Sequence, residues 1–337
     1  MNIYGAKIIH RLQGINVWWH VGGVAAVILI LVLVPAKHQS TSWVFTHQIN
    51  NSGFGNYWFY VLPVGFLLTQ YTITGFDASA HVSEETGQAT KAAAQGLWKS
   101  IAYSAVAGWL MLLAFLYAAT DEAGITAAGG ASQAIFVTAL SMGWAKIILI
   151  ITCVGQFFCG MSCVTAGSRM LFAFSRDKAV PGHKYWTKLD KNKNPSNAAF
   201  GIGILAAILT LPALWAPEGT VVPVAFFAVT SVTVIGLFLS FLIPIYLRWR
   251  MGDKFKQGSW NLGNKWKWMA PIAIVEIVFI TIVLCLPTTP AGVPGNEAFT
   301  WKAVQYAPLA ILFVIGAAML WWQLSAKKWF TGPKIVN

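Results

Sequence analysis

The sequence predicts an all-α integral membrane protein with about eight transmembrane helices and both termini in the cytoplasm. Hydrophobic residues make up 57% of the 337 residues and charged residues only 10%, whereas a soluble domain carries about 25% charged residues. The apolar residues gather in stretches of about 20 residues, the length that an α-helix needs to cross the hydrocarbon core. Lys and Arg concentrate in every second segment that connects these stretches. Because such residues favour the cytoplasmic side, this pattern sets the predicted orientation of the helices in the membrane.

Eight apolar stretches define the predicted helices in chain order: 15–36, 57–82, 98–119, 144–174, 197–216, 221–247, 268–287 and 304–323. The first follows Lys7 and Arg11 and has no small-residue cleavage site after it, so a retained signal anchor fits better than a cleaved signal peptide. The second, fourth and sixth are long enough to be tilted, bent or extended into water. The fifth and sixth are separated only by a very short turn at Pro217, Glu218 and Gly219.

Charge and tryptophan placement support this topology. With the N-terminus in the cytoplasm, Lys37, Lys146 and Lys302 fall outside and the other 20 of the 23 Lys and Arg residues fall inside, as the positive-inside rule requires. The net charge of +12 therefore reflects membrane topology, and we expect no nucleic-acid partner. Tryptophan suits the headgroup region, and eight lie near predicted helix ends: Trp98, Trp144, Trp215, Trp249, Trp268, Trp301, Trp321 and Trp322.

The sequence gives no sign of catalytic or metal chemistry. Its four cysteines, Cys153, Cys159, Cys163 and Cys285, form no CxxC pair, and we interpret them as small buried hydrophobic residues. The GxxxxGK, HExxH and GxSxG motifs are absent. We therefore expect no metal, no cofactor, no catalytic residues and no enzymatic activity.

The second apolar stretch contains a polar interruption, "QYTITGFDASAHVSEET" at residues 70–86. A charged side chain near the bilayer centre costs at least about 2.5 kcal/mol, so Asp77 and His81 need a cavity or a protein environment. Thr74 and Gly75 are poor residues for a helix interior, and unwound backbone at membrane depth is tolerated beside a cavity. Alternatively, the helix ends near Gly75, and Asp77 and Ser79 are ordinary capping residues.

Two motifs resemble those of a known transporter family. "GFDASAHVSEET" (75–86) is similar to the sixth-helix signature of amino acid permeases of the amino acid–polyamine–organocation superfamily, nearest the branch that carries amino acids, γ-aminobutyrate or choline. "GSRMLFAFSRDKAVP" (167–181), followed by "NPSNA" (194–198), resembles that family's eighth helix and the loop after it. The resemblance covers nearly the whole chain.

The resemblance implies a partial inverted-repeat, broken-helix transporter fold. The family has about twelve spans, with helices one to five and six to ten forming two inverted repeats around a central site. Residues 1–337 would then be a single permease domain that runs from family helix five to helix twelve. Because helices one to four would be missing, we expect a truncated permease that cannot transport alone.

Several site residues follow from the resemblance. The segment Gly75, Phe76, Asp77 and Ala78 would be the unwound part of the broken helix, where backbone carbonyls receive the substrate ammonium group. Thr74, just before it, is also expected to bind the substrate. Asp77 would act as a counter-charge or proton carrier. Tyr71, one turn earlier, matches a position where the family often has an aromatic lid over the substrate, although plain interhelical packing is an equal alternative.

Coupling residues are proposed on two other helices. By the resemblance, His20 would occupy a fifth-helix position where several proton-coupled relatives carry a lysine, and histidine is the side chain suited to exchanging a proton at physiological pH. The alternative is an interfacial histidine beside Trp18 and Trp19. Ser162 and Thr165, with Ser168, are candidate sodium ligands, although such hydroxyls more often bond to the backbone. Glu276 is a lone carboxylate in the seventh stretch, and we interpret it as protonated or buried in an interface.

These expectations combine into one function. The sequence predicts a secondary active transporter in the plasma membrane that moves amino acids or related amines with H+ or Na+ and is surrounded by lipid. The alternative is a non-transporting truncated remnant or structural membrane subunit. The substrate, the coupling ion and the oligomeric state are left open.

Overall fold

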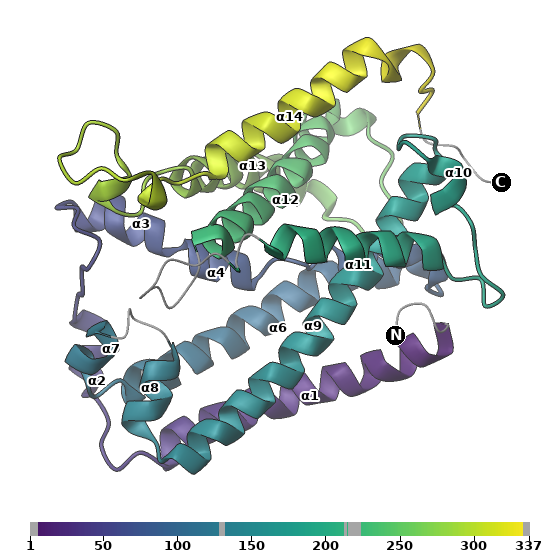
Figure 1. Ribbon diagram of the computed structural model, residues 1–337. Helices are drawn as coiled ribbons and strands as arrows, with labels where there is room; N and C mark the ends of the chain where they lie inside the picture. The colour runs from purple at the N-terminus through teal and green to yellow at the C-terminus, as the bar shows by residue number, and fades with distance from the viewer. Residues whose placement is uncertain (1–5, 128–131, 212–213, 215–223, 333–337) are drawn as a thin grey trace.

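The computed structural model describes residues 6–127, 132–211, 214 and 224–332, and every regular element in these ranges is helical (Figure 1). Six helices are long and apolar enough to cross a membrane, by length and composition. They are α1 (Ala6–Leu33), α6 (Ala89–Ala118), α9 (Met142–Arg176), α12 (Val224–Met251), α13 (Trp266–Leu284) and α14 (Ala307–Leu324). Each coincides with one of the eight predicted stretches.

Within the described residues, the other two predicted stretches contain shorter helices. Residues 57–82 form a π-helical turn, η1 (Tyr57–Val61), and the short helices α3 (Leu62–Gly65), α4 (Leu67–Thr72) and α5 (Ala78–His81). The fifth stretch is α11 (Ser196–Thr210), 15 residues long. The predicted turn at 217–219 lies outside the described residues.

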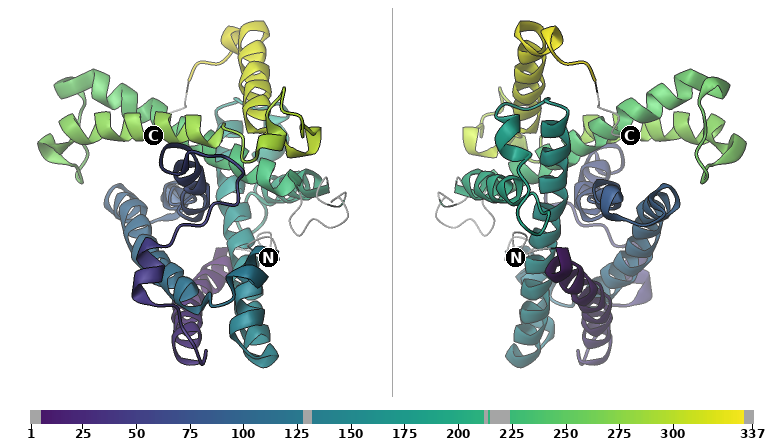
Figure 2. Two further views of the ribbon diagram at one scale, coloured as in Figure 1. Left: turned by 90° about the vertical axis from the view of Figure 1, so that its left-hand side faces the viewer. Right: turned by 90° about the vertical axis from the view of Figure 1, so that its right-hand side faces the viewer.

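The helices form two packed groups. In the first, α1 packs against α6 and α9, and α11 packs against α9 (Figure 1). In the second, α12 packs against α13 and α14, and Figure 2 shows α12 and α13 side by side, extending away from the first group. The broken stretch 57–82 touches both groups, because α5 packs on α6 and α9 while α4 packs on α12.

Small apolar cores lie inside the groups, and most large apolar side chains face outward. Val27, Leu31, Ala114 and Ile148 are buried where α1, α6 and α9 meet. By contrast, Phe313 on α14 is 76% exposed. Continuous apolar exposure of this kind would be costly in water and is what a lipid-facing helix presents.

The cysteine interpretation was wrong. Among the described residues, Cys153, Cys159 and Cys163 are exposed and Cys285 is partly buried. All three lie on α9, and Cys159 borders a cavity that α9 shares with α1 and α6.

A cap of short elements covers one end of the first group. The helices α2 (Thr41–Thr46), α7 (Glu122–Ala127) and α8 (Ser132–Ala139) lie at the end of α9 where that helix begins (Figure 1). His47 pairs with Glu122 there, with Nε2 3.0 Å from Oε2. The Lys- and Arg-rich connection from α9 to α11, which contains α10 (His183–Trp186), lies at the opposite end.

Candidate functional site

The predicted interruption of the second stretch is confirmed at residues 73–77, called here the break segment. α4 ends at Thr72 and α5 begins at Ala78, with turn conformation between them. The prediction was wrong for Ala78, which is the first residue of α5 and not part of the unwound segment. Gly75 has φ +85°, a left-handed conformation that glycine adopts without steric cost. Asp77 occupies the N-cap position of α5 but makes no side-chain capping bond, so the alternative of an ordinary cap does not explain it.

The break segment leaves backbone polar groups open. Within the described part of the chain, the amides of Gly75 and Phe76 donate no backbone hydrogen bond, and the carbonyls of Ile73 and Thr74 accept none. Unpaired backbone groups are costly in an apolar environment. They are therefore available for water or for a ligand.

A cavity of about 590 Å3, called here the break cavity, lies against this segment. It is bordered by the break segment and by residues from α1, α6 and α9. Among the predicted site residues it brings together Thr74, Gly75, Phe76, His20 and Ser162. Residues 142 positions apart in the sequence, His20 and Ser162, thus face one space.

Polar side chains of α1 and α9 form one wall of this cavity. Asn16 Nδ2 lies 2.9 Å from Gln13 Oε1 and 3.2 Å from Ser162 Oγ, and Gln13 Nε2 lies 3.1 Å from the same hydroxyl oxygen. His20 Nδ1 lies 3.0 Å from the Asn16 carbonyl oxygen and therefore donates to it, which leaves Nε2 as an acceptor in the neutral ring.

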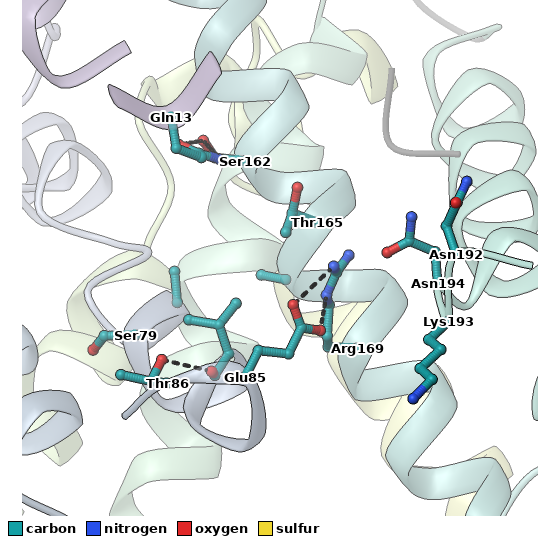
Figure 3. Close-up of a pocket in the computed structure, with 13 residues that line it drawn as sticks. Gln13, Ser79, Glu85, Thr86, Ser162, Thr165, Arg169, Asn192, Lys193 and Asn194 are labelled. Carbon is teal, nitrogen blue, oxygen red and sulfur yellow. Dashed lines mark hydrogen bonds and ion pairs between the residues drawn. The ribbon is translucent and has the colours of Figure 1, made fainter. Parts of the chain in front are cut away.

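A second cavity of about 690 Å3, called here the inner cavity, is also bordered by Ser162, and Figure 3 shows the residues that line it. Ala78 and Thr165 line it, and Ser162 lines both cavities. Ser162 and Thr165 donate to the carbonyls of Phe158 and Met161, at 3.0 and 2.9 Å. Backbone bonding, the alternative weighed for these hydroxyls, is therefore present, and ion ligation stays a prediction.

Two predicted residues lie away from both cavities. Asp77 lines neither; its Oδ2 pairs at 2.9 Å with Nε2 of His81, one helical turn later. Tyr71 also lines neither cavity, and its side chain is partly exposed. Its carbonyl oxygen accepts the Thr74 hydroxyl at 2.6 Å. The roles of Asp77 as counter-charge and Tyr71 as lid stay predictions.

The phenyl ring of Phe76 ties the break segment to the second helix group. It lies 5.0 Å from the ring of Phe241 on α12, measured between centroids. Gln70, just before the break, donates to Glu276 on α13, with Nε2 3.3 Å from Oε1. Glu276 is exposed, so the interpretation of this residue as buried in an interface was wrong. Its carboxylate contacts the broken helix at Gln70.

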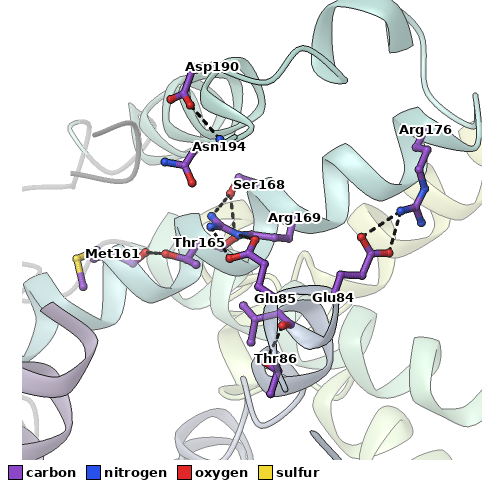
Figure 4. Close-up of polar contacts among 11 residues, drawn as sticks. Glu84, Glu85, Thr86, Met161, Thr165, Ser168, Arg169, Arg176, Asp190 and Asn194 are labelled. Atoms are coloured by element: carbon purple, nitrogen blue, oxygen red, sulfur yellow. Dashed lines mark hydrogen bonds and ion pairs between the residues drawn. The ribbon is translucent and has the colours of Figure 1, made fainter. Parts of the chain in front are cut away.

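Two ion pairs at the border of the inner cavity were not predicted. Arg169 pairs with Glu85 and Arg176 with Glu84 (Figure 4). Gln13 and Asn16 were also missed, although their spacing from His20 places all three along one side of a helix. The spacing of Gln13, Asn16 and His20 could have indicated this polar face from the sequence. The ion pairs could not be predicted in that way, because their members are more than 80 positions apart.

Comparison with known proteins assigns the family. The sequence profile of the amino acid permease family matches residues 1–317. The chain belongs to the amino acid permease family. Its members are transporters and not enzymes, and together with the six apolar helices this makes the chain a multi-pass integral membrane protein.

Individual relatives agree with this assignment. The chain is 33% identical to amino-acid permease BAT1 of Arabidopsis thaliana over 94% of its length, and 33% identical to the Oryza sativa homolog over 94%. A Candida albicans protein named for polyamine transport is 26% identical over 80% of this permease chain. The aligned parts cover 61%, 60% and 48% of these relatives, so the chain spans well under two thirds of their length.

Proposed function

We propose that this permease chain contributes the broken-helix half of a secondary active transporter for amino acids or related amines. The full site would move its substrate across the plasma membrane, the typical location of such permeases, by alternating access. The Lys- and Arg-rich end would lie in the cytoplasm. The observation that carries the proposal is the break segment, which separates α4 from α5 and borders the break cavity.

The chemistry of the break segment suits a zwitterionic or cationic ligand. The open carbonyls of Ile73 and Thr74 are acceptors for an ammonium group, and the open amides of Gly75 and Phe76 are donors for a carboxylate. Unwound helix ends serve both purposes in secondary transporters. Amino acids carry both groups, and amines carry the first.

Coupling to an ion gradient is the finer part of the proposal. His20 lines the break cavity and would exchange a proton there. Ser162 and Thr165 would supply oxygen ligands for Na+ at the inner cavity. These two routes predict different ion dependence, proton for the first and sodium for the second.

A second candidate function is a structural or interaction role in the membrane without transport. Substrate binding is tested apart from uptake, since a chain can bind a ligand without completing a transport cycle.

The test is a thermal-stability screen of the purified chain in detergent with amino acids and polyamines. A bound ligand at about 100 times its Kd stabilises the folded state by about 2.7 kcal/mol. We expect at least one amino acid or amine to stabilise the chain, and proteoliposome uptake then separates transport from binding alone. Absence of stabilisation by every ligand, with no uptake, would contradict the proposed function.

A further inference from the structure

A further cavity of about 530 Å3, called here the edge cavity, lies between the ends of α9 and α14. One wall comes from the segment between α9 and α10, and the other from the end of α14 and the turn η8 (Ala326–Lys328). Figure 1 shows α10 near the end of α14. The cavity is lined by Lys178, Val180, Pro181, His183, Trp321, Ser325 and Trp329. Because α9 and α14 are both membrane-spanning candidates, it lies where two such helices end.

The polar side chains of the edge cavity are hydrogen-bond donors. Ser325 Oγ accepts the indole Nε1 of Trp329 at 3.1 Å, so its own O–H is left to donate. The Lys178 amine carries three donors, and the His183 ring carries at least one in either protonation state. Within the described part of the chain, neither of these two side chains makes a hydrogen bond or an ion pair, and no carboxylate lines the cavity.

Lys178 has a backbone conformation that disfavours a lysine. Its φ is +62°, in the left-handed region that is strained for a residue with a Cβ. It directly follows Asp177, the C-cap of α9, at the position where helices most often place glycine. Strain of this kind persists where the surrounding structure or a function requires the residue. A lysine here supplies an unpaired amine to the cavity, which glycine would not.

Aromatic and apolar side chains form the rest of the edge cavity. The rings of Trp321 and Trp329 lie 6.5 Å apart, measured between centroids, and Val180 and Pro181 add apolar surface. The Pro181 carbonyl accepts the indole Nε1 of Trp186 at 3.0 Å, which ties this wall to α10. Indole rings favour the headgroup level of a membrane. The cavity therefore suits a ligand with one anionic group and an uncharged remainder.

We propose that the edge cavity binds the phosphate group of a phosphate ester. Lys178, His183 and Ser325 would donate to the phosphate oxygens, which accept charge-assisted hydrogen bonds. Trp321 and Trp329 would lie against the uncharged part of the ligand. Two sources carry this chemistry: the headgroup of an anionic phospholipid in the cytoplasmic leaflet and a soluble phosphate ester. The inference goes beyond the proposed function and does not depend on transport.

The test measures thermal stability of the purified chain in detergent as each probe is titrated. Dioctanoyl phosphatidylglycerol supplies the lipid headgroup, glycerol phosphate supplies the soluble ester, and dioctanoylglycerol is the control that lacks phosphate. We expect saturable stabilisation by at least one of the phosphate probes and none by the control. A response to the lipid alone assigns a headgroup, and a response to glycerol phosphate assigns a soluble ester. No response to either, or an equal response to dioctanoylglycerol, would overturn the site.

A matched pair of glycine variants tests the lysine. Lys178→Gly removes the amine and relieves the left-handed backbone, so the chain without ligand should be at least as stable as wild type. We expect the apparent affinity for the stabilising phosphate probe to fall about tenfold, because a charge-assisted hydrogen bond is lost. Lys193→Gly relieves the same strain, at φ +59°, and removes the same charge away from this cavity. It should leave the affinity unchanged.

Two results with these variants would contradict the assignment. Unchanged affinity in Lys178→Gly would show that the amine does not contact the phosphate. Equal weakening in Lys178→Gly and Lys193→Gly would show a general effect of positive charge on anionic ligands and not a site at the edge cavity.

Discussion

Gln13 and Ser162 meet across 149 positions of the sequence, with the amide Nε2 3.1 Å from the hydroxyl oxygen. The contact joins α1 to α9 at the point where the break cavity and the inner cavity adjoin, since Ser162 lines both. Among the described residues that line the two cavities, Ser162 is the one that they share.

Replacing Ser162 with alanine tests this position. The variant loses the hydroxyl that Gln13 and Asn16 contact, and interhelical bonds of this kind average about 0.6 kcal/mol in membranes. We expect a small loss of thermal stability and, if Ser162 ligates sodium, loss of any stabilisation by Na+. Thr152→Val is the control, because Thr152 also donates to its own helix, at 2.9 Å, but lies at neither cavity. Equal sodium responses in both variants would argue against ligation.

Gly75→Ala tests the backbone of the break segment. The left-handed conformation costs an L-residue about 1–2 kcal/mol, and the open space around Gly75 means that no steric clash adds to this. We expect lower thermal stability and weaker ligand stabilisation. Gly108→Ala, inside α6 and also without neighbours within 4 Å, should instead be neutral or stabilising. Equal changes in thermal stability and ligand stabilisation in the two variants would show that the left-handed conformation of residue 75 is not required.

Glu276 and Gln70 make a testable contact between α13 and the broken helix. Glu276→Gln keeps an acceptor oxygen for Gln70 Nε2, whereas Glu276→Leu removes it. Gln70 Oε1 is already buried without a partner, so leucine would leave both ends of the amide unpaired, at a cost of about 1 kcal/mol or more. We expect the wild type and Glu276→Gln to unfold at a higher temperature than Glu276→Leu. A leucine variant more stable than wild type would show that the contact is unfavourable overall.

Asp190 gives a pH-dependent prediction in the loop between α10 and α11. Its carboxylate accepts the Ser196 hydroxyl at 2.5 Å and the amides of Asn192 and Asn194 at 2.8 and 2.9 Å. These bonds, the Ser196 hydroxyl first, hold the pKa of Asp190 below its usual value. The folded state thus binds this proton less readily than the unfolded state.

The sign follows from that lowered pKa. The stability that Asp190 contributes is present above the ordinary aspartate pKa, about 3.9, and is lost as the pH falls through the lower folded value. The difference in thermal stability between wild type and Asp190→Asn should therefore shrink as the solution is acidified below about pH 4. A difference that stays constant with pH would contradict the role of the carboxylate charge.

The sequence predicted the long apolar helices well and their contacts poorly. Lipid-facing helices are specified by local composition, so six predicted stretches coincide with α1, α6, α9, α12, α13 and α14. The break was also local, since Gly75 and the neighbouring threonines disfavour helix. The division of 57–82 into η1, α3 and α4 occurs where Pro63 and Gly65 weaken the helix.

Side-chain partners could not be predicted for a different reason. The pair of Asp77 with His81 is an exception, because the i+4 spacing that brings them together is a local signal which the sequence analysis did not use. Glu85 and Arg169 meet because α5 packs against α9 and η2 (Ser83–Glu85), which carries Glu85, directly follows α5. Such long-range pairs depend on how helices cross, and helix crossing is not encoded in local periodicity.

Hydrogen–deuterium exchange at the break segment tests the central claim most directly. The amides of Gly75 and Phe76 are compared with those in the middle of α6, in lipid nanodiscs, with and without a stabilising amino acid or amine. Fast exchange at both amides, slowed by the ligand while α6 stays protected, is the predicted result. Protection of Gly75 and Phe76 equal to that of α6 would show a closed, hydrogen-bonded helix and would contradict an open break beside a solvated cavity.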